Sequence, residues 1–185
     1  MSPRRTSTLN LEHILLALLD QKPMHGYELY QELCATEGID LIWNITQSLL
    51  YADLDKLEGM GMLSSYVIQG ETYPPRKYFQ ITEKGKSSLQ TWIRTPARRA
   101  RDIRQEFLAK LIVARRYGTT QALELIRIQK QTCQTWLKEL EGKVPQERPG
   151  QSDEWFVDSF RLMRVEGVLR WLKDCERAVM DSENQ

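Results

Sequence analysis

Cysteine and histidine are scarce in this sequence, which has 3 Cys and 2 His among 185 residues. The cysteines Cys34, Cys133 and Cys175 stand singly, and there is no CxxC pair or His/Cys cluster. Zinc sites and disulfide frameworks need such residues at short, regular spacings, so we expect no metal and no cofactor. Because the sequence also lacks a Gly-rich phosphate loop and a Ser/His/Asp set, we do not expect an enzyme.

Long apolar runs and a strong net charge are missing as well. The first ten residues are polar, and no apolar segment as long as a signal peptide or membrane span follows them. We therefore expect a cytoplasmic protein. The formal net charge is +1; residues 1–95 carry 9 Lys+Arg against 11 Asp+Glu, a net −2, and residues 96–185 carry 17 against 14, a net +3. The negative first half counts against nucleic acid as a partner.

The stretch from Thr46 to Leu63 has the most informative pattern. Leu50, Leu54 and Leu57 recur at i, i+4 and i+7, which places them in one apolar stripe on a helix. Thr46 is a good N-cap, and the glycines at 59 and 61 favour a helix end there. The polar residues of its first turns then fall on the outward side.

Further helices and a hairpin flank this stretch. Helical spacing of apolar residues predicts helices at 11–19, 25–37 and 83–94. Two runs rich in β-formers, 63–69 and 77–81, predict a hairpin. Three helices followed by a hairpin are typical of a winged helix-turn-helix, which lays its third helix in the major groove of DNA. We expect residues 1–95 to form such a DNA-binding domain.

Heptad spacing dominates the second half of the chain. Apolar residues between 119 and 141 recur at spacings of 3 and 4, with Lys130 as a polar interruption. The last helix, from Asp153 to about Asp181, carries two adjoining apolar stripes, and a surface helix needs only one. We therefore expect a mainly α protein with a small β-hairpin, in which residues 96–185 form an antiparallel helical dimerisation domain. The interface candidates are Phe107, Leu111, Trp155, Phe156, Phe160, Leu162, Met163, Val165, Leu169 and Leu172.

Several short motifs stand out along the chain. They are Leu11-Glu12-His13-Ile14-Leu15-Leu16, His25-Gly26-Tyr27-Glu28-Leu29, Leu50-Tyr51 with Leu54, Leu57-Glu58 and Gly61, and Arg76-Lys77-Tyr78-Phe79 with Ile81-Thr82-Glu83-Lys84-Gly85. Together they resemble the PadR family of bacterial transcriptional regulators. Residues 104–111, RQEFLAKL, are similar to the entry to the dimerisation helices in the longer members, those like the virulence activator AphA. The resemblance covers nearly the whole chain and implies a winged-helix regulator. One departure is that the family often has Gly then Ser or Thr before Leu-Tyr, where this chain has Ser48 and Leu49.

Nine residues are candidates for contact with DNA. The polar start of the third helix suits base reading, because Gln47 can pair with adenine in the major groove. The resemblance favours DNA contacts of Tyr27 and Tyr51, and the two cations Arg76 and Lys77 suit phosphate. The alternative roles are structural: an aromatic bracing the hairpin, a polar helix start and a solvated strand. The full set is Tyr27, Asn44, Thr46, Gln47, Ser48, Tyr51, Lys56, Arg76 and Lys77.

Two further features each allow two interpretations. Five arginines between positions 94 and 104 either follow the DNA backbone or pair with acids in the dimer interface. Trp92, Trp155 and Trp171 either line a cavity for a small aromatic effector or belong to the core.

The pattern as a whole predicts a sequence-specific DNA-binding transcriptional regulator, and we expect a repressor. It would bind a pseudo-palindromic operator as a homodimer, under the control of an effector. The alternative is a winged-helix adaptor for protein interactions that has lost DNA binding, which the net −2 of residues 1–95 favours.

Overall fold

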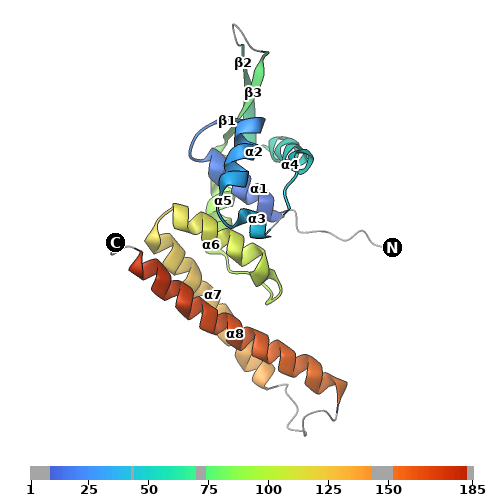
Figure 1. Cartoon of the computed structure of the whole chain (residues 1–185), viewed down its shortest axis with the longest axis vertical. Helices are drawn as coiled ribbons and strands as arrows, with labels where there is room; N and C mark the ends of the chain where they lie inside the picture. The colour runs from blue at the N-terminus through green and yellow to red at the C-terminus, as the bar shows by residue number, and fades with distance from the viewer. Residues whose placement is uncertain (1–8, 43, 70–73, 143–151, 183–185) are drawn as a thin grey trace. The chain divides into compact units, whose positions relative to one another are not determined.

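The computed structural model describes residues 9–42, 44–69, 74–142 and 152–182 (Figure 1). The chain divides into two compact units. The first consists of Met1–Ile93 with Arg104–Val113, and the second of Arg94–Ile103 with Ala114–Gln185. Among the described residues, no helix is both long and apolar enough to cross a bilayer.

The first unit combines helices with a small antiparallel sheet. Its helices are α1 (Leu9–Leu19), α2 (Gly26–Ala35), α3 (Ile39–Ile42), α4 (Gln47–Gly59) and α5 (Glu83–Arg94), and its strands are β1 (Met24–His25), β2 (Leu63–Ile68) and β3 (Arg76–Ile81). The strand order is β1-β3-β2. The predicted helices and the hairpin are confirmed. Strand β1 was not predicted, because two residues are too few to show the alternation of a strand.

Helix α1 lies in the core of this unit and packs against α2, α4 and β3. Leu15, Leu16 and Leu18 are at most 1% exposed although they point in different directions around the helix. A helix that is apolar all round is covered on every side. The predicted stripe of α4 is confirmed too, since Leu50, Leu54 and Leu57 are also at most 1% exposed.

The turn from β3 into α5 depends on a close approach of two backbone segments. A Cβ at Gly85 would lie 2.3 Å from the carbonyl oxygen of Met62, so the position requires glycine. The amide of Gly85 donates to Oγ1 of Thr82 at 3.2 Å, and that hydroxyl donates to the carbonyl oxygen of Gly61 at 2.8 Å. These contacts explain why threonine and glycine flank the start of α5.

Two long helices, α7 (Thr119–Glu141) and α8 (Asp153–Asp181), form the body of the second unit. They run antiparallel (Figure 1), with Lys130 pairing to Glu176 at 2.7 Å. The polar residue that interrupts the predicted heptad seam therefore has a partner on the facing helix. The short helix η1 (Asp102–Arg104) belongs to the second unit up to Ile103, and α6 (Glu106–Arg116) begins in the first unit and ends in the second.

A buried glutamine ties the segment before η1 to α7. Gln129 is 0% exposed, and its Oε1 accepts a hydrogen bond of 2.7 Å from the amide of Ala97. The segment of residues 94–103 is thus tied to α7 by a buried polar side chain.

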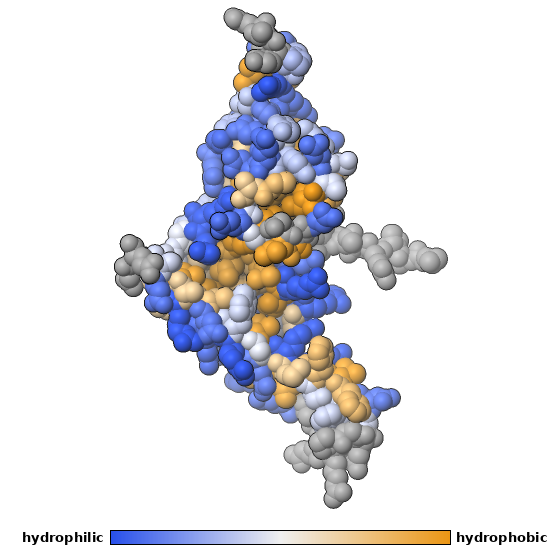
Figure 2. All heavy atoms as spheres, in the orientation of Figure 1, coloured by the Kyte–Doolittle hydropathy of each residue, from blue (hydrophilic) through white to orange (hydrophobic). Residues whose placement is uncertain are grey.

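The interface candidates differ in exposure. Phe107, Val165 and Leu172 are at most 2% exposed, so they are core residues of their own chain and offer no surface to a second copy. Leu111, Trp155, Leu162 and Leu169 are partly exposed, and Phe156, Phe160 and Met163 are 56–60% exposed. Of the two predicted stripes of α8, one packs inward and the other faces outward. Figure 2 shows apolar surface toward the beginning of α8.

Candidate nucleic-acid interface

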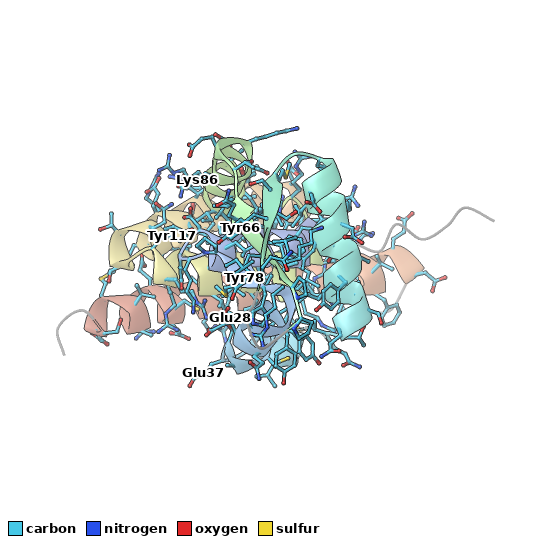
Figure 3. The ribbon with its side chains drawn as sticks, turned by 90° about the horizontal axis from the view of Figure 1, so that it is seen from above. Glu28, Glu37, Tyr66, Tyr78, Lys86 and Tyr117 are labelled. Atoms are coloured by element: carbon cyan, nitrogen blue, oxygen red, sulfur yellow. The ribbon has the colours of Figure 1, made fainter. Side chains whose placement is uncertain are left out.

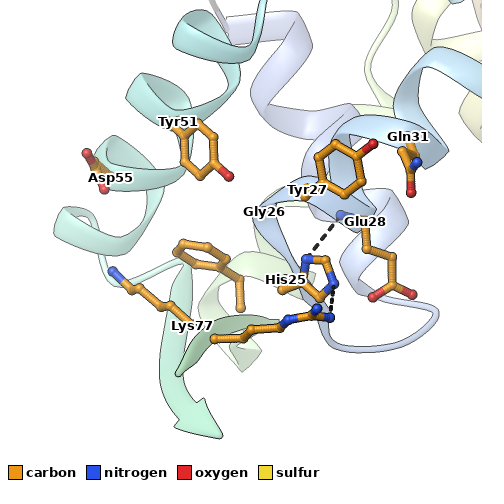
Figure 4. Close-up of a pocket in the computed structure, with 10 residues that line it drawn as sticks. His25, Gly26, Tyr27, Glu28, Gln31, Tyr51, Asp55 and Lys77 are labelled. Carbon is orange, nitrogen blue, oxygen red and sulfur yellow. Dashed lines mark hydrogen bonds between the residues drawn. The ribbon is translucent and has the colours of Figure 1, made fainter. Parts of the chain in front are cut away.

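A depression of about 680 Å³ opens in the first unit, which we call the α2–α4 depression (Figure 4). The first turns of α2, the outer face of α4 and strand β3 border it. Four of the nine predicted DNA-contact residues meet here. Its lining residues are His25, Gly26, Tyr27, Glu28, Gln31, Tyr51, Asp55, Arg76, Lys77 and Phe79.

Helix α2 begins at the edge of this depression, so the positive end of its dipole lies there. His25 is its N-cap, and the imidazole Nδ1 accepts a hydrogen bond of 3.2 Å from the amide of Glu28. The other imidazole nitrogen lies 3.5 Å from a guanidinium nitrogen of Arg76. Tyr27, in the first turn, is 54% exposed. An exposed hydroxyl beside a helix N-terminus suits a phosphate group.

The ring of Tyr51 lies against Gly26. A Cβ at Gly26 would come within 2.5 Å of the Tyr51 ring and 2.7 Å of its hydroxyl oxygen. Tyr51 nevertheless remains 44% exposed, on the side of α4 that faces Tyr27 in Figure 4. The tyrosine therefore packs against the first turn of α2 and still presents part of its side chain to the depression.

The start of α4 is exposed beside this depression but does not line it. Thr46 is confirmed as the N-cap, because its Oγ1 accepts a hydrogen bond of 3.3 Å from the amide of Leu49. Asn44, Gln47 and Ser48 are exposed. Their side chains are open to a base edge, whereas the hydroxyl of Thr46 serves the helix.

The hairpin of β2 and β3 forms the wing. Tyr66 and Tyr78 stack across it with ring centroids 5.7 Å apart (Figure 3). Val67 and Ile68 are 58% and 47% exposed near its tip. Lys77 is bound to α4 through Glu58 at 2.7 Å, and this bond, together with one from Ser65, holds the pKa of the Glu58 carboxyl below its ordinary value.

Two of the candidate DNA-contact residues, both lysines, are thus engaged in ion pairs. Besides Lys77, the ammonium of Lys56 lies 2.5 Å from a carboxylate oxygen of Glu12, which is 2% exposed. The hydrogen bond to Glu12 raises the pKa of the Lys56 ammonium above its ordinary value. Because the carboxylate of buried Glu12 already compensates the charge of the Lys56 ammonium, Lys56 attracts a phosphate less strongly than the sequence indicates.

Sequence reasoning missed the role of Asp53. This acid is only 4% exposed and lies beside Glu12 and Lys56. Its Oδ2 is buried without a hydrogen-bond partner among the described residues. Burial, and then the charge of Glu12, raise the pKa of the Asp53 carboxyl to about 6 against the opposing effect of Lys56. The signal was its position, since residue 53 falls within the stripe of Leu50, Leu54 and Leu57.

The three tryptophans proposed for an effector site do not meet in one cavity. Trp92 stacks on His13 with a centroid distance of 4.8 Å, and the ammonium of Lys110 lies 5.4 Å from its centre. Trp155 and Trp171 are sixteen residues apart on α8, about 24 Å along its axis. In the part of the chain that the structure describes, no cluster of three or more His, Cys, Asp or Glu side chains is placed to hold a metal.

Comparison with known proteins agrees with this arrangement. Residues 15–91 match the transcriptional regulator PadR-like family. The negative transcriptional regulator PadR of Bacillus subtilis is 26% identical over 133 residues, which are 71% of each chain. Its crystal structure in complex with operator DNA has a TM-score of 0.45 and 20% identity, covering 91% of this chain and 98% of that one. Its structure in complex with p-coumaric acid has a TM-score of 0.42 and 19% identity, covering 95% and 98%.

The matched residues 15–91 extend from within α1 to within α5 and include α2, α4, the wing and the α2–α4 depression. Over these residues the chain is similar to the PadR-like family of transcriptional regulators.

Proposed function

We propose that this protein is a DNA-binding transcriptional regulator that binds a pseudo-palindromic operator as a homodimer. The observation that carries the proposal is the α2–α4 depression, in which a helix N-terminus, two exposed tyrosines and a cation meet inside a PadR-like region. Phosphate contacts from such groups fix a protein in register on DNA, and a helix start in the major groove reads the bases.

In this proposal the residues divide into two roles. Tyr27, Tyr51 and Arg76 contact phosphates in and around the depression. Asn44, Gln47 and Ser48 read base edges from the exposed start of α4, while Thr46 orders that start as its N-cap. The ion-paired lysines Lys56 and Lys77 contribute less.

The dimer is the second part of the proposal. Residues 1–95 bind DNA and residues 96–185 join two copies through the outward stripe of α8, where Phe156, Phe160 and Met163 are exposed at i, i+4 and i+7. Trp155, Leu162 and Leu169 are partly exposed on the same helix and add to this surface, and Leu111 on α6 remains a further candidate. Two copies bound to one operator fix the spacing between its half-sites.

We extend three further points from the relatives. The Bacillus subtilis protein is named a negative regulator, and we propose repression here, in the cytoplasm, where bacterial DNA lies. Since that protein has been solved with p-coumaric acid, we also propose control by a small aromatic effector. The assignment to the longer AphA-like members stays a prediction, because the matched family region ends before the C-terminal helices.

Selecting bound duplexes from a random pool tests the function, because a dimeric regulator returns a two-fold symmetric sequence. Tyr51→Phe then tests the site by removing the hydroxyl while keeping the ring on Gly26. We expect operator affinity to fall about tenfold, the loss typical of a hydrogen bond to a charged group. Tyr30→Phe, at a tyrosine of α2 outside the depression, is the matched control and should bind normally.

The adaptor alternative rests on the net −2 of residues 1–95, and the internal pairing of Lys22, Lys56 and Lys77 with acids also favours it. Salt dependence separates the two functions. A regulator that neutralises phosphates binds duplex DNA tightly at low salt and much more weakly as salt rises, whereas an adaptor that has lost DNA binding shows little affinity for DNA even at low salt.

A further inference from the structure

An arginine-rich cavity of about 250 Å³ lies in the second unit and shares no lining residue with the α2–α4 depression. It is bordered by the segment before η1, by α7 and by α8. We call it the arginine cavity. Its lining residues are Arg98, Arg99, Ala100, Trp136, Glu139, Leu140, Arg161, Arg164 and Val165.

The charges around the arginine cavity do not balance. Arg161 is paired with Asp158 at 3.0 Å. Arg98, Arg99 and Arg164 form no ion pair with residues that the structure describes, and Glu139 is the single carboxylate in the lining. Three guanidinium groups against one carboxylate leave a net charge of +2 at this cavity.

Arg164 has a buried donor with no acceptor. Its Nε is shielded from solvent and lacks a hydrogen-bond partner among the described residues, while its guanidinium lies 5.9 Å from the centre of the Phe160 ring. An unsatisfied buried donor is costly, more so when it is charged. The side chain of Arg164 is partly buried and lines the cavity, so an anion there would meet its guanidinium group through the other nitrogens.

Part of the cavity lining is apolar, and the backbone next to the arginines is fixed by a hydrogen bond. Trp136 is half-buried, Val165 is 2% exposed, and Leu140 lies beside them. The hydrogen bond from Ala97 to Gln129 fixes the backbone directly before Arg98. The volume is just below the range of about 300–1,000 Å³ for drug-sized ligands. A single ring with one acidic group is therefore the appropriate size.

We propose that the arginine cavity binds a small organic phosphate, with a phosphate monoester on the arginines and one flat ring against Trp136. A phosphate monoester carries about −1.5 to −2 near neutral pH, which matches the net +2, and guanidinium groups bind phosphate oxygens in pairs. A monocarboxylate would leave one positive charge uncompensated. The site involves none of the nine candidate DNA-contact residues, so the proposal goes beyond the proposed function and does not depend on it.

Calorimetric titration of the full chain without DNA tests this site, with phenyl phosphate, inorganic phosphate and benzoate as probes. We expect phenyl phosphate to bind at least about tenfold more tightly than either of the others, because it alone supplies both the ring and the second charge. Its affinity should fall as the pH drops below about 6, where the phosphate dianion takes up a proton and becomes a monoanion.

Variants then assign the binding to this cavity. Arg164→Ala should weaken phenyl phosphate binding about tenfold or more, and Arg164→Lys should also weaken it, because it keeps the charge but loses the planar fork of donors that binds phosphate oxygens in pairs. Trp136→Leu should lower the affinity for phenyl phosphate toward that for inorganic phosphate. Arg177→Ala is the matched control, since Arg177 is an exposed arginine of α8 outside the cavity.

Three results would overturn the proposal. Benzoate or inorganic phosphate binding as tightly as phenyl phosphate would make the proposed class wrong. Equal losses in Arg164→Ala and Arg177→Ala would move the binding away from the cavity. If phenyl phosphate does not bind and Arg164→Ala instead dissociates the dimer in sedimentation, the arginines contact acids of a second copy. DNA affinity plays no part in these readouts, so failure here leaves the proposed function intact.

Discussion

Gly26 allows the ring of Tyr51 to lie against the first turn of α2. A methyl group there would come within 2.5 Å of the ring, and the half-exposed ring is the part that can move. We therefore expect Gly26→Ala to fold, since alanine also favours helix, but to displace Tyr51 from the depression. Operator affinity, measured by fluorescence anisotropy, should fall about tenfold, as for Tyr51→Phe.

Gly59→Ala is the matched control. Gly59 lies on α4, the helix that carries Tyr51, and a Cβ there would meet nothing within 4 Å. This variant should leave affinity unchanged. If Gly26→Ala binds the operator normally, the packing of the Tyr51 ring against Gly26 is not needed for DNA contact.

The buried carboxyl group of Asp53 makes the stability of the folded protein depend on pH. Its pKa is raised in the folded protein from 3.8 to about 6, so the folded state binds the proton more tightly than the unfolded state does. The folded state therefore loses stability as pH rises from about 4 to about 6, and the loss is complete above that range. Asp53→Asn removes the buried charge and should raise the free energy of unfolding by about 2–3 kcal/mol at neutral pH.

Urea denaturation at about pH 7.5 and about pH 4.5 measures this effect, since the gain should shrink at the lower pH. Asp55→Asn, at an exposed acid two residues away, should change stability little at either pH. A gain from Asp53→Asn that is the same at both pH values would show that its charge is not the cause.

At the scale of elements, Gln129 secures the segment that precedes η1. Gln129→Leu would keep the volume roughly constant but leave the amide of Ala97 buried without its acceptor. We expect a loss of about 1–3 kcal/mol in the free energy of unfolding. Hydrogen exchange should be faster at the Ala97 amide, and phenyl phosphate should bind the arginine cavity more weakly because Arg98 and Arg99 follow directly.

Gln134→Leu, at an exposed position of the same helix, serves as the control and should leave both readouts unchanged. Unaltered exchange at Ala97 in Gln129→Leu would mean that other contacts hold the segment.

Periodicity was sufficient to predict most elements of this fold. The stripe of Leu50, Leu54 and Leu57 and the threonine cap at position 46 each depend on residues close in sequence, and both are confirmed. Strand β1 exists only because Met24 and His25 pair with Phe79 and Tyr78. A pairing across more than fifty residues leaves no local trace in a two-residue segment.

The candidate site was predictable to a similar extent. Tyr27, Tyr51, Arg76 and Lys77 were predicted separately and meet in one depression. The engagement of Lys56 by Glu12 was not visible, because it joins α4 to α1 across 44 positions. Ion pairs of this kind depend on tertiary packing, so sequence indicates which cations exist but not which remain available to DNA.

For the whole molecule, the outward stripe of α8 predicts the oligomeric state. Phe160 and Met163 are 56% and 60% exposed, so a charge at either position costs the protomer little but places an unpaired carboxylate inside the proposed interface. We expect Phe160→Glu and Met163→Glu to sediment as folded monomers, with helix content by circular dichroism unchanged. Because a monomer holds one half-site, operator affinity should fall by about 10²-fold or more. Glu166→Ala, at an exposed residue on the same helix, should remain dimeric. Folded dimers of both glutamate variants would place the interface elsewhere on the chain.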